Sequence, residues 1–103
     1  MASPMRIRAT MINGSTEVKV LMSHPMETGQ RKDSSGALVP VHHIKEVIAK
    51  HNDKVVLQAD WGAAVSQNPF LQFTFNGGAA GDTVSVTWND NKGETRTDQV
   101  ALR

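Results

Sequence analysis

The stretch LQFTFNGGAAGDTVSVTW, Leu71 to Trp88, decides the fold class of this chain. Apolar residues alternate with polar ones from Leu71 to Phe75 and again from Val84 to Trp88. Such alternation is typical of strands that bury one face and expose the other. The glycine-rich residues between the two runs, Gly77 to Asp82, precede a strand, whereas a phosphate-binding loop opens a helix. They therefore predict a turn from one sheet to another.

Further predicted strands lie on both sides of this stretch. Their ranges are 6–12, 17–22, the two halves of 42–62, and 94–102. Turn residues at intervals of about 8 to 12 positions, with about seven short strands in all, indicate an immunoglobulin-like fold. The predicted fold class is therefore all-β: an immunoglobulin-like β-sandwich of about seven antiparallel strands, in one domain over residues 1–103.

The segment from His42 to Gly62 is the ambiguous one. Ile44, Val47 and Ile48 have helical spacing, whereas the residues from Val55 to Trp61 alternate as a strand does. Periodicity alone does not settle so short a run. We favour two strands joined by a hairpin at Asn52-Asp53, with a bulge or register irregularity in the first strand.

The composition favours a folded protein and argues against several functions. Of 103 residues, 39% are hydrophobic and 20% charged, with a net charge of +1, so neither disorder nor binding to nucleic acid or membrane is indicated. No cysteine is present, which excludes thiolate chemistry within this chain. We expect Trp61, Phe73, Phe75 and Trp88 to build the core by packing. The start shows no secretory-signal pattern, and no apolar run approaches the ~20 residues of a membrane span.

Four histidines and five methionines raise the possibility of a copper-type site. Adjacent histidines, His42 and His43, point to opposite faces of a strand and cannot share an ion without a bend. Met5 lies in a start that we expect to fray, and Met11 and Met22 fall on apolar strand faces, where core packing explains them. We therefore predict no metal or other cofactor. The alternative that stays open is a small periplasmic metal-binding or redox domain that uses His24 with neighbouring methionines.

Catalysis is not indicated either. No serine lies in a Gly-x-Ser-x-Gly motif, and the acidic residues mostly mark turns or exposed faces, as solvated carboxylates do. The chain is therefore predicted not to be an enzyme.

The stretch LMSHPMETG, Leu21 to Gly29, ends a predicted strand at Pro25, which has no N–H to give to a sheet. The loop that follows combines methionines with His24 and Arg31, residue types favoured at protein interfaces. Two interpretations stay open. These side chains contact a partner, or they brace the loop.

Five segments of the chain resemble one family, SoxZ. They are MRIRA (Met5 to Ala9), VKVLMSHPMETGQRKD (Val18 to Asp33), GALVPVHHI (Gly36 to Ile44), WGAAVSQNPFLQFTF (Trp61 to Phe75) and AGDTVSVTWNDNKG (Ala80 to Gly93). The similarity covers essentially the whole chain, and the MSHPMETG…RKD run is its most specific part.

The resemblance implies a fold, a partner and a role. SoxZ is a non-catalytic immunoglobulin-like sandwich that forms a heterodimer with SoxY. SoxY carries sulfur intermediates of thiosulfate oxidation on the cysteine of a C-terminal Gly-Gly-Cys-Gly-Gly arm and presents them to the other Sox enzymes, which contact the complex transiently. The implied location is the periplasm, with this chain exported together with SoxY.

The resemblance and the residue types together nominate a SoxY interface. The candidates are Met22, His24, Pro25, Met26, Arg31 and Phe70. Aromatic, methionine and arginine anchors carry most of the energy of such contacts. An interface sheet left uncovered also finds other partners, so we expect that the isolated chain can form homo-oligomers.

Overall fold

The computed structural model describes residues 3–62 and 64–102, and within them the chain forms only strands and loops. The strands are β1 (Arg6–Ile12), β2 (Ser15–Leu21), β3 (Ile44–His51), β4 (Lys54–Asp60), β5 (Phe70–Asn76), β6 (Thr83–Asp90) and β7 (Thr95–Ala101). The predicted all-β class and the seven antiparallel strands are confirmed. The described residues contain no helix that is long and apolar enough to cross a membrane.

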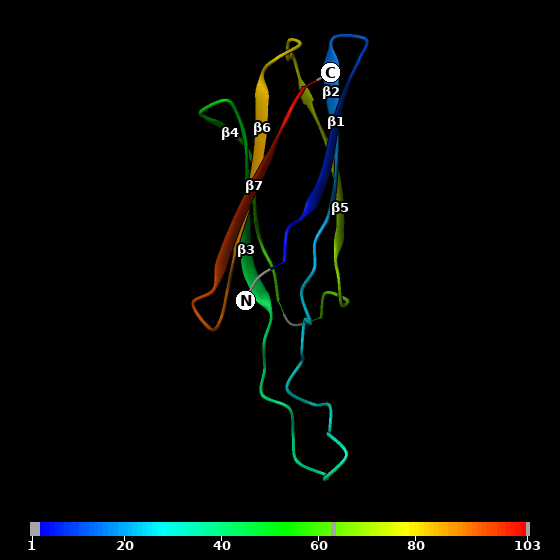
Figure 1. Ribbon diagram of the computed structural model, residues 1–103, viewed down its shortest axis with the longest axis vertical. Helices are drawn as coiled ribbons and strands as arrows, with labels where there is room; N and C mark the ends of the chain where they lie inside the picture. The colour runs from blue at the N-terminus through cyan, green and yellow to red at the C-terminus, as the bar shows by residue number, and fades with distance from the viewer. Residues whose placement is uncertain (1–2, 63, 103) are drawn as a thin grey trace.

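The strands form two sheets that face each other (Figure 1). One has the order β1-β2-β5 and the other β4-β3-β6-β7, and all neighbouring strands are antiparallel. The residues from Gly77 to Asp82 carry the chain from β5 to β6, so the predicted turn between sheets is confirmed. At one side β1 approaches β7, and the Met5 N–H donates to Asp98 Oδ2 at 2.9 Å.

The turn after β5 depends on a glycine. Gly78 has a φ of +110°, which L side chains rarely adopt, and a Cβ there would contact the Thr16 hydroxyl and lie 2.7 Å from Leu102 Cδ2. Thr16 in turn donates to the Gly77 carbonyl at 2.7 Å. The close packing of this turn joins the two sheets at the end of the sandwich where β5 ends.

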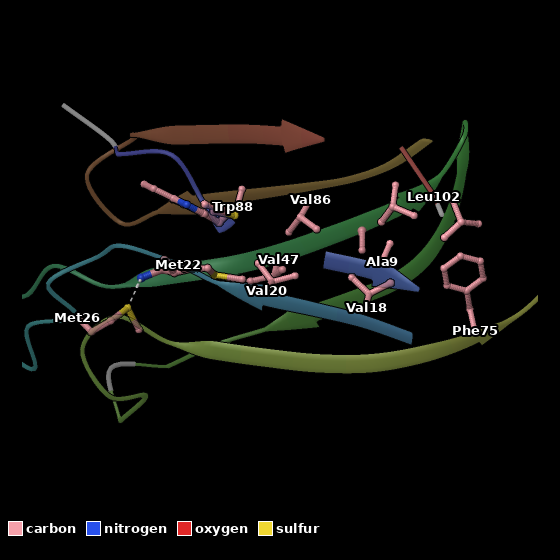
Figure 2. Packing of buried hydrophobic residues seen from close by; sticks show 14 residues of the cluster. Ala9, Val18, Val20, Met22, Met26, Val47, Phe75, Val86, Trp88 and Leu102 are labelled. Carbon is pink, nitrogen blue, oxygen red and sulfur yellow. Dashed lines mark hydrogen bonds between the residues drawn. The ribbon is translucent and has the colours of Figure 1, made fainter. Parts of the chain in front are cut away.

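The core lies between the sheets and consists mainly of inward-facing residues that alternate along the strands (Figure 2). Trp88 and Phe75 belong to the buried cluster, while Trp61 and Phe73 are partly buried and pack against it. Each large apolar side chain that leaves water stabilises the fold by about 1.5–3 kcal/mol. The predicted aromatic core is therefore confirmed, with its two tryptophans unequally buried.

Two expectations about methionines were wrong. Met5 is only 6% exposed and belongs to the core instead of a frayed start, because the Asp98 hydrogen bond holds its backbone against β7. Met11 is 37% exposed, because it lies near the end of β1, an edge strand with a neighbour on one side only. Met22, by contrast, is 1% exposed, as expected for a core residue.

Strand β3 contains the irregularity that made its sequence ambiguous. Its register shifts between Ile44 and Glu46 against β6, and between Ala49 and Lys50 against β4. The first shift places Ile44 and Val47, three positions apart, on the same buried face. The predicted hairpin and the predicted irregularity are both confirmed.

The connection from β2 to β3, residues 22–43, projects from the end of the sandwich as an arm (Figure 1). Glu27 and His42 exchange backbone hydrogen bonds of 2.6 and 3.0 Å, and a second isolated bridge joins Lys32 to Leu38. The arm lengthens the molecule to 52 Å, against 21 and 20 Å in the other directions. Its two ends meet at the sandwich, where the candidate site lies.

Candidate functional site

Three polar side chains converge at the base of the arm: His24, His42 and Asp90. His24 lies three residues after β2, His42 two residues before β3, and Asp90 is the last residue of β6. The backbone pairing of Glu27 with His42 brings the two ends of the arm together, so both imidazoles reach the same carboxylate. We call these three residues the arm-base cluster.

Asp90 is the centre of the cluster. Its Oδ2 lies 3.0 Å from His24 Nε2 and 2.8 Å from His42 Nε2, and its Oδ1 accepts the backbone N–H groups of Lys92 and Glu94 at 3.0 and 2.9 Å. The Asp90 side chain has no exposed surface, and that of His24 has 1%. One carboxylate thus ties both ends of the arm to the β6–β7 turn.

The hydrogen bonds fix the tautomer of His24. Its Nδ1 lies 3.1 Å from the Met26 N–H, which can only donate, so Nδ1 is the acceptor and the proton sits on Nε2, facing Asp90. The ring also makes edge contacts with Trp88, at a centroid distance of 5.0 Å, and with His42, at 4.5 Å. Neutral His24 therefore satisfies both of its ring nitrogens within the chain.

Both pKa values of the buried pair shift downward. Burial is the main cause of the lowered pKa of His24, and it outweighs the hydrogen bond to Asp90. Burial alone would raise the pKa of Asp90, but the hydrogen bonds from His24, the Glu94 backbone and His42 reverse that effect and lower it. At neutral pH the pair is a neutral imidazole that donates to an ionised carboxylate.

The cluster brings together donor atoms of the kind that hold transition metals. One atom each from His24, His42 and Asp90 lie within 4.8 Å of one another. An ion on Nε2 of His24 would move the proton to Nδ1, where the Met26 N–H already points. Met26 Sδ, the neighbouring thioether, accepts the Ile44 N–H at 3.4 Å (Figure 2). The hydrogen-bond pattern thus favours a bracing role for the cluster over a metal site.

A pocket of about 460 Å³ lies beside the cluster. His24 and His42 line it together with Ser23, Asn68 and Trp88. Trp88 is fully buried, and among the described residues its indole N–H has no acceptor. The pocket is therefore a mainly polar cleft that reaches the core at Trp88.

The structure separates the six nominated interface residues. Met22, His24 and Met26 are 1%, 3% and 5% exposed and lie inside the base of the arm. Pro25 is exposed there, and Arg31 lies further along the arm, where it donates to Glu27 at 2.7 and 2.9 Å.

The last nominated residue, Phe70, is 60% exposed on the first position of β5. The six residues do not form one surface, and contact of any of them with a partner stays a prediction. The burial of Met22, His24 and Met26 favours the interpretation in which they brace the loop.

Sequence reasoning missed His42 and Asp90. Asp90 is an exception to the expectation that the acidic residues mostly mark turns or exposed faces, because it continues the buried alternation of Val84, Val86 and Trp88 on the inner face of β6. That alternation was the signal that could have found it. His42 carried no such signal, because it reaches Asp90 only through the closure of the arm. His43 does not join the cluster, and its Nδ1 bonds to the Ile44 carbonyl at 2.9 Å.

A second surface lies on the outer face of the sheet β1-β2-β5. Leu21 and Phe70, 43% and 60% exposed, are paired across β2 and β5. Arg6, Arg8 and Lys19 surround them and line with them a groove of about 240 Å³. We call these five residues the basic-apolar face.

Comparison with solved structures shows that the fold recurs at low identity. A superoxide reductase in the oxidised state has a TM-score of 0.63 and 16% identity, covering 96% of this chain and 86% of that one. The hypothetical protein PH1083 from Pyrococcus horikoshii OT3 has 0.63 and 16%, covering 99% and 89%. The superoxide reductase (neelaredoxin) from Ignicoccus hospitalis has 0.63 and 12%, covering 99% and 80%. Such identities show a shared fold alone.

Comparison with sequence-family models gives a more specific assignment than the shared fold. No curated protein matches the chain. The family model described as sulphur oxidation protein SoxZ matches residues 5–101, which includes all seven strands and the arm. This chain therefore belongs to the SoxZ family of sulphur oxidation proteins.

Proposed function

We propose that this chain is the non-catalytic subunit of a SoxYZ sulfur-carrier complex, in which it binds SoxY. The observation that carries the proposal is the SoxZ family match over residues 5–101 in a chain without cysteine. A carrier of covalently bound sulfur needs a thiolate that forms and releases the sulfur bond. This chain contains no thiolate, so the reactive thiolate belongs to its partner.

Two features of the structure support a binding role. The basic-apolar face exposes two adjacent apolar side chains, Leu21 and Phe70. Exposed apolar patches with a polar border are typical of protein–protein interfaces. At the arm-base cluster, Nε2 of His24 and Nε2 of His42 both face Asp90, so within the described residues neither is bonded to a hydroxyl that it could activate. The polar cluster braces the fold, and the exposed face is left for the partner.

The proposal extends to location and to other partners. SoxY would be exported folded together with this chain, which places the complex in the periplasm. The other Sox enzymes would contact the complex transiently while they act on the SoxY cysteine. A partner without a thiol suits such a carrier, because no second cysteine competes for the bound sulfur by exchange.

The decisive experiment is co-expression of this chain with SoxY. We expect a 1:1 complex by size-exclusion chromatography with light scattering. When thiosulfate is supplied with the other Sox enzymes and an electron acceptor that takes the two electrons released as the S–S bond forms, mass spectrometry of the separated subunits should show a mass increase on SoxY and none on this chain. A SoxY Cys→Ser variant is the control that should form the complex and gain no mass. Separate elution of the two chains, or a sulfur adduct on this chain, would contradict the proposal.

A further inference from the structure

The basic-apolar face has an ordered arrangement across three strands. Arg6, Leu21 and Phe70 lie in one row of the sheet, in register from β1 through β2 to β5. Arg8 and Lys19 lie directly opposite each other, two positions further along β1. Two exposed apolar side chains are thus bordered by three cations.

These cations have little compensation within the chain. Like charges directly opposite each other in an antiparallel pair destabilise the sheet, and Arg8 faces Lys19 in this way. Among residues 3–62 and 64–102, no carboxylate pairs with Arg6 or Arg8, and Lys19 has only a 3.7 Å contact with Glu17. The free chain therefore keeps a repulsion next to exposed Phe70 that a partner's carboxylates would relieve.

We infer that the basic-apolar face is the surface on which SoxY docks, through a segment that carries carboxylates beside an apolar side chain. This inference rests on the proposed function and names its interface. The apolar part of the segment would cover Leu21 and Phe70, and its carboxylates would pair with Arg6 and Arg8. The groove of about 240 Å³ between these residues has room for one large side chain.

The charge pattern also argues against a second copy of this chain as the occupant of this face, so any homo-oligomer of the isolated chain would form through another surface. Two identical faces related by a two-fold axis would bring Arg6, Arg8 and Lys19 against the same cations of the other copy. Like charges that face each other across an interface disfavour the wrong partner. A different chain with acidic groups fits this face.

The test compares SoxY binding by variants of the basic-apolar face with binding by variants of the other sheet. On the basic-apolar face the variants are Phe70→Ala and the double reversal Arg6→Glu with Arg8→Glu. Matched controls on the other sheet are Val55→Ala, whose side chain is 49% exposed on β4, and Lys50→Glu, exposed on β3. Circular dichroism and thermal unfolding establish that each variant is folded before its affinity is measured.

We expect each face variant to weaken SoxY binding about tenfold or more and each control to change it less than about twofold. Association of the unmodified chain should slow as salt rises, and the double reversal should remove that dependence. Folded face variants that bind as tightly as the unmodified chain would overturn this inference and leave the proposed function intact. No binding by the unmodified chain would overturn both.

Discussion

The arm-base cluster and the basic-apolar face put polar groups to opposite uses. At the arm base, one buried carboxylate satisfies two imidazoles and two backbone N–H groups, and His24 satisfies its second nitrogen on Met26. On the outer face of β1-β2-β5, Arg6 and Arg8 are exposed and no described carboxylate pairs with them. The conspicuous histidine of MSHPM, His24, is thus buried and hydrogen-bonded within the chain, whereas the less conspicuous Arg6 and Arg8 stay exposed.

Removal of Asp90 should have the largest effect on the cluster side of this comparison. Asp90→Ala leaves four donors without an acceptor, of which the Nε2–H of His24 is fully buried. Each hydrogen bond to a charged group contributes about 1.5–3 kcal/mol, so we expect the free energy of unfolding to fall by more than about 3 kcal/mol. Urea denaturation followed by tryptophan fluorescence measures it. Asp82→Ala is the matched control, because Asp82 pairs with His51 at 2.7 Å where its side chain is 27% exposed, and we expect a smaller loss. Equal losses would contradict a special role for the buried carboxylate.

The two histidines of the cluster should contribute unequally. His24→Ala removes a side chain with 1% exposure, opens a cavity and strands the Met26 N–H, and we expect a loss of about 2–3 kcal/mol in the free energy of unfolding. His42→Ala removes one hydrogen bond from a side chain that is 19% exposed, and about 1 kcal/mol is expected. Equilibrium denaturation of both variants compares them. A rise in melting temperature on adding Zn²⁺ that disappears in His24→Ala would instead assign the cluster to a metal.

Acid should weaken the arm base before the rest of the fold. The pKa of His24 is lowered from 6.5 in the folded chain, so below 6.5 the unfolded state takes up a proton that the folded state resists. Its contribution to stability is complete above pH 6.5 and declines as the pH falls toward the folded pKa. Asp90, whose pKa is lowered from 3.8, loses its contribution only below that value. Denaturation midpoints on either side of pH 6.5 should differ more for the unmodified chain than for His24→Gln, and equal differences would contradict this assignment.

The contrast between the two regions was only partly predictable from sequence. Alternation along β2 places Val18 and Val20 on the inner face and so places Leu21 on the outer face. The same alternation continued along β6 would have placed Asp90 on the inner face. The bulge in β3 was predictable in kind but not in position. The meeting of His24 with His42 was not predictable, because it depends on backbone pairing within a long connection that has no periodicity.

The smallest predicted effect is that of Arg8→Glu, and it distinguishes the two regions most sharply. This substitution should stabilise the free chain but weaken the complex. Arg8→Glu converts the Arg8–Lys19 repulsion into an attraction, so the free energy of unfolding of the isolated chain should rise by at most about 1 kcal/mol. The same variant should bind SoxY more weakly, since the new carboxylate opposes the acidic segment that the face is proposed to hold.

Thermal unfolding of the isolated chain and titration with SoxY measure the two effects of Arg8→Glu separately. Arg8→Ser is the control that removes the charge without reversing it, and it should lie between the unmodified chain and Arg8→Glu in both measurements. If Arg8→Glu lowered both the stability of the chain and its affinity for SoxY, Arg8 would be a residue that stabilises the sheet and not an interface residue. A gain in stability with a loss of affinity is the result that only an interface residue gives.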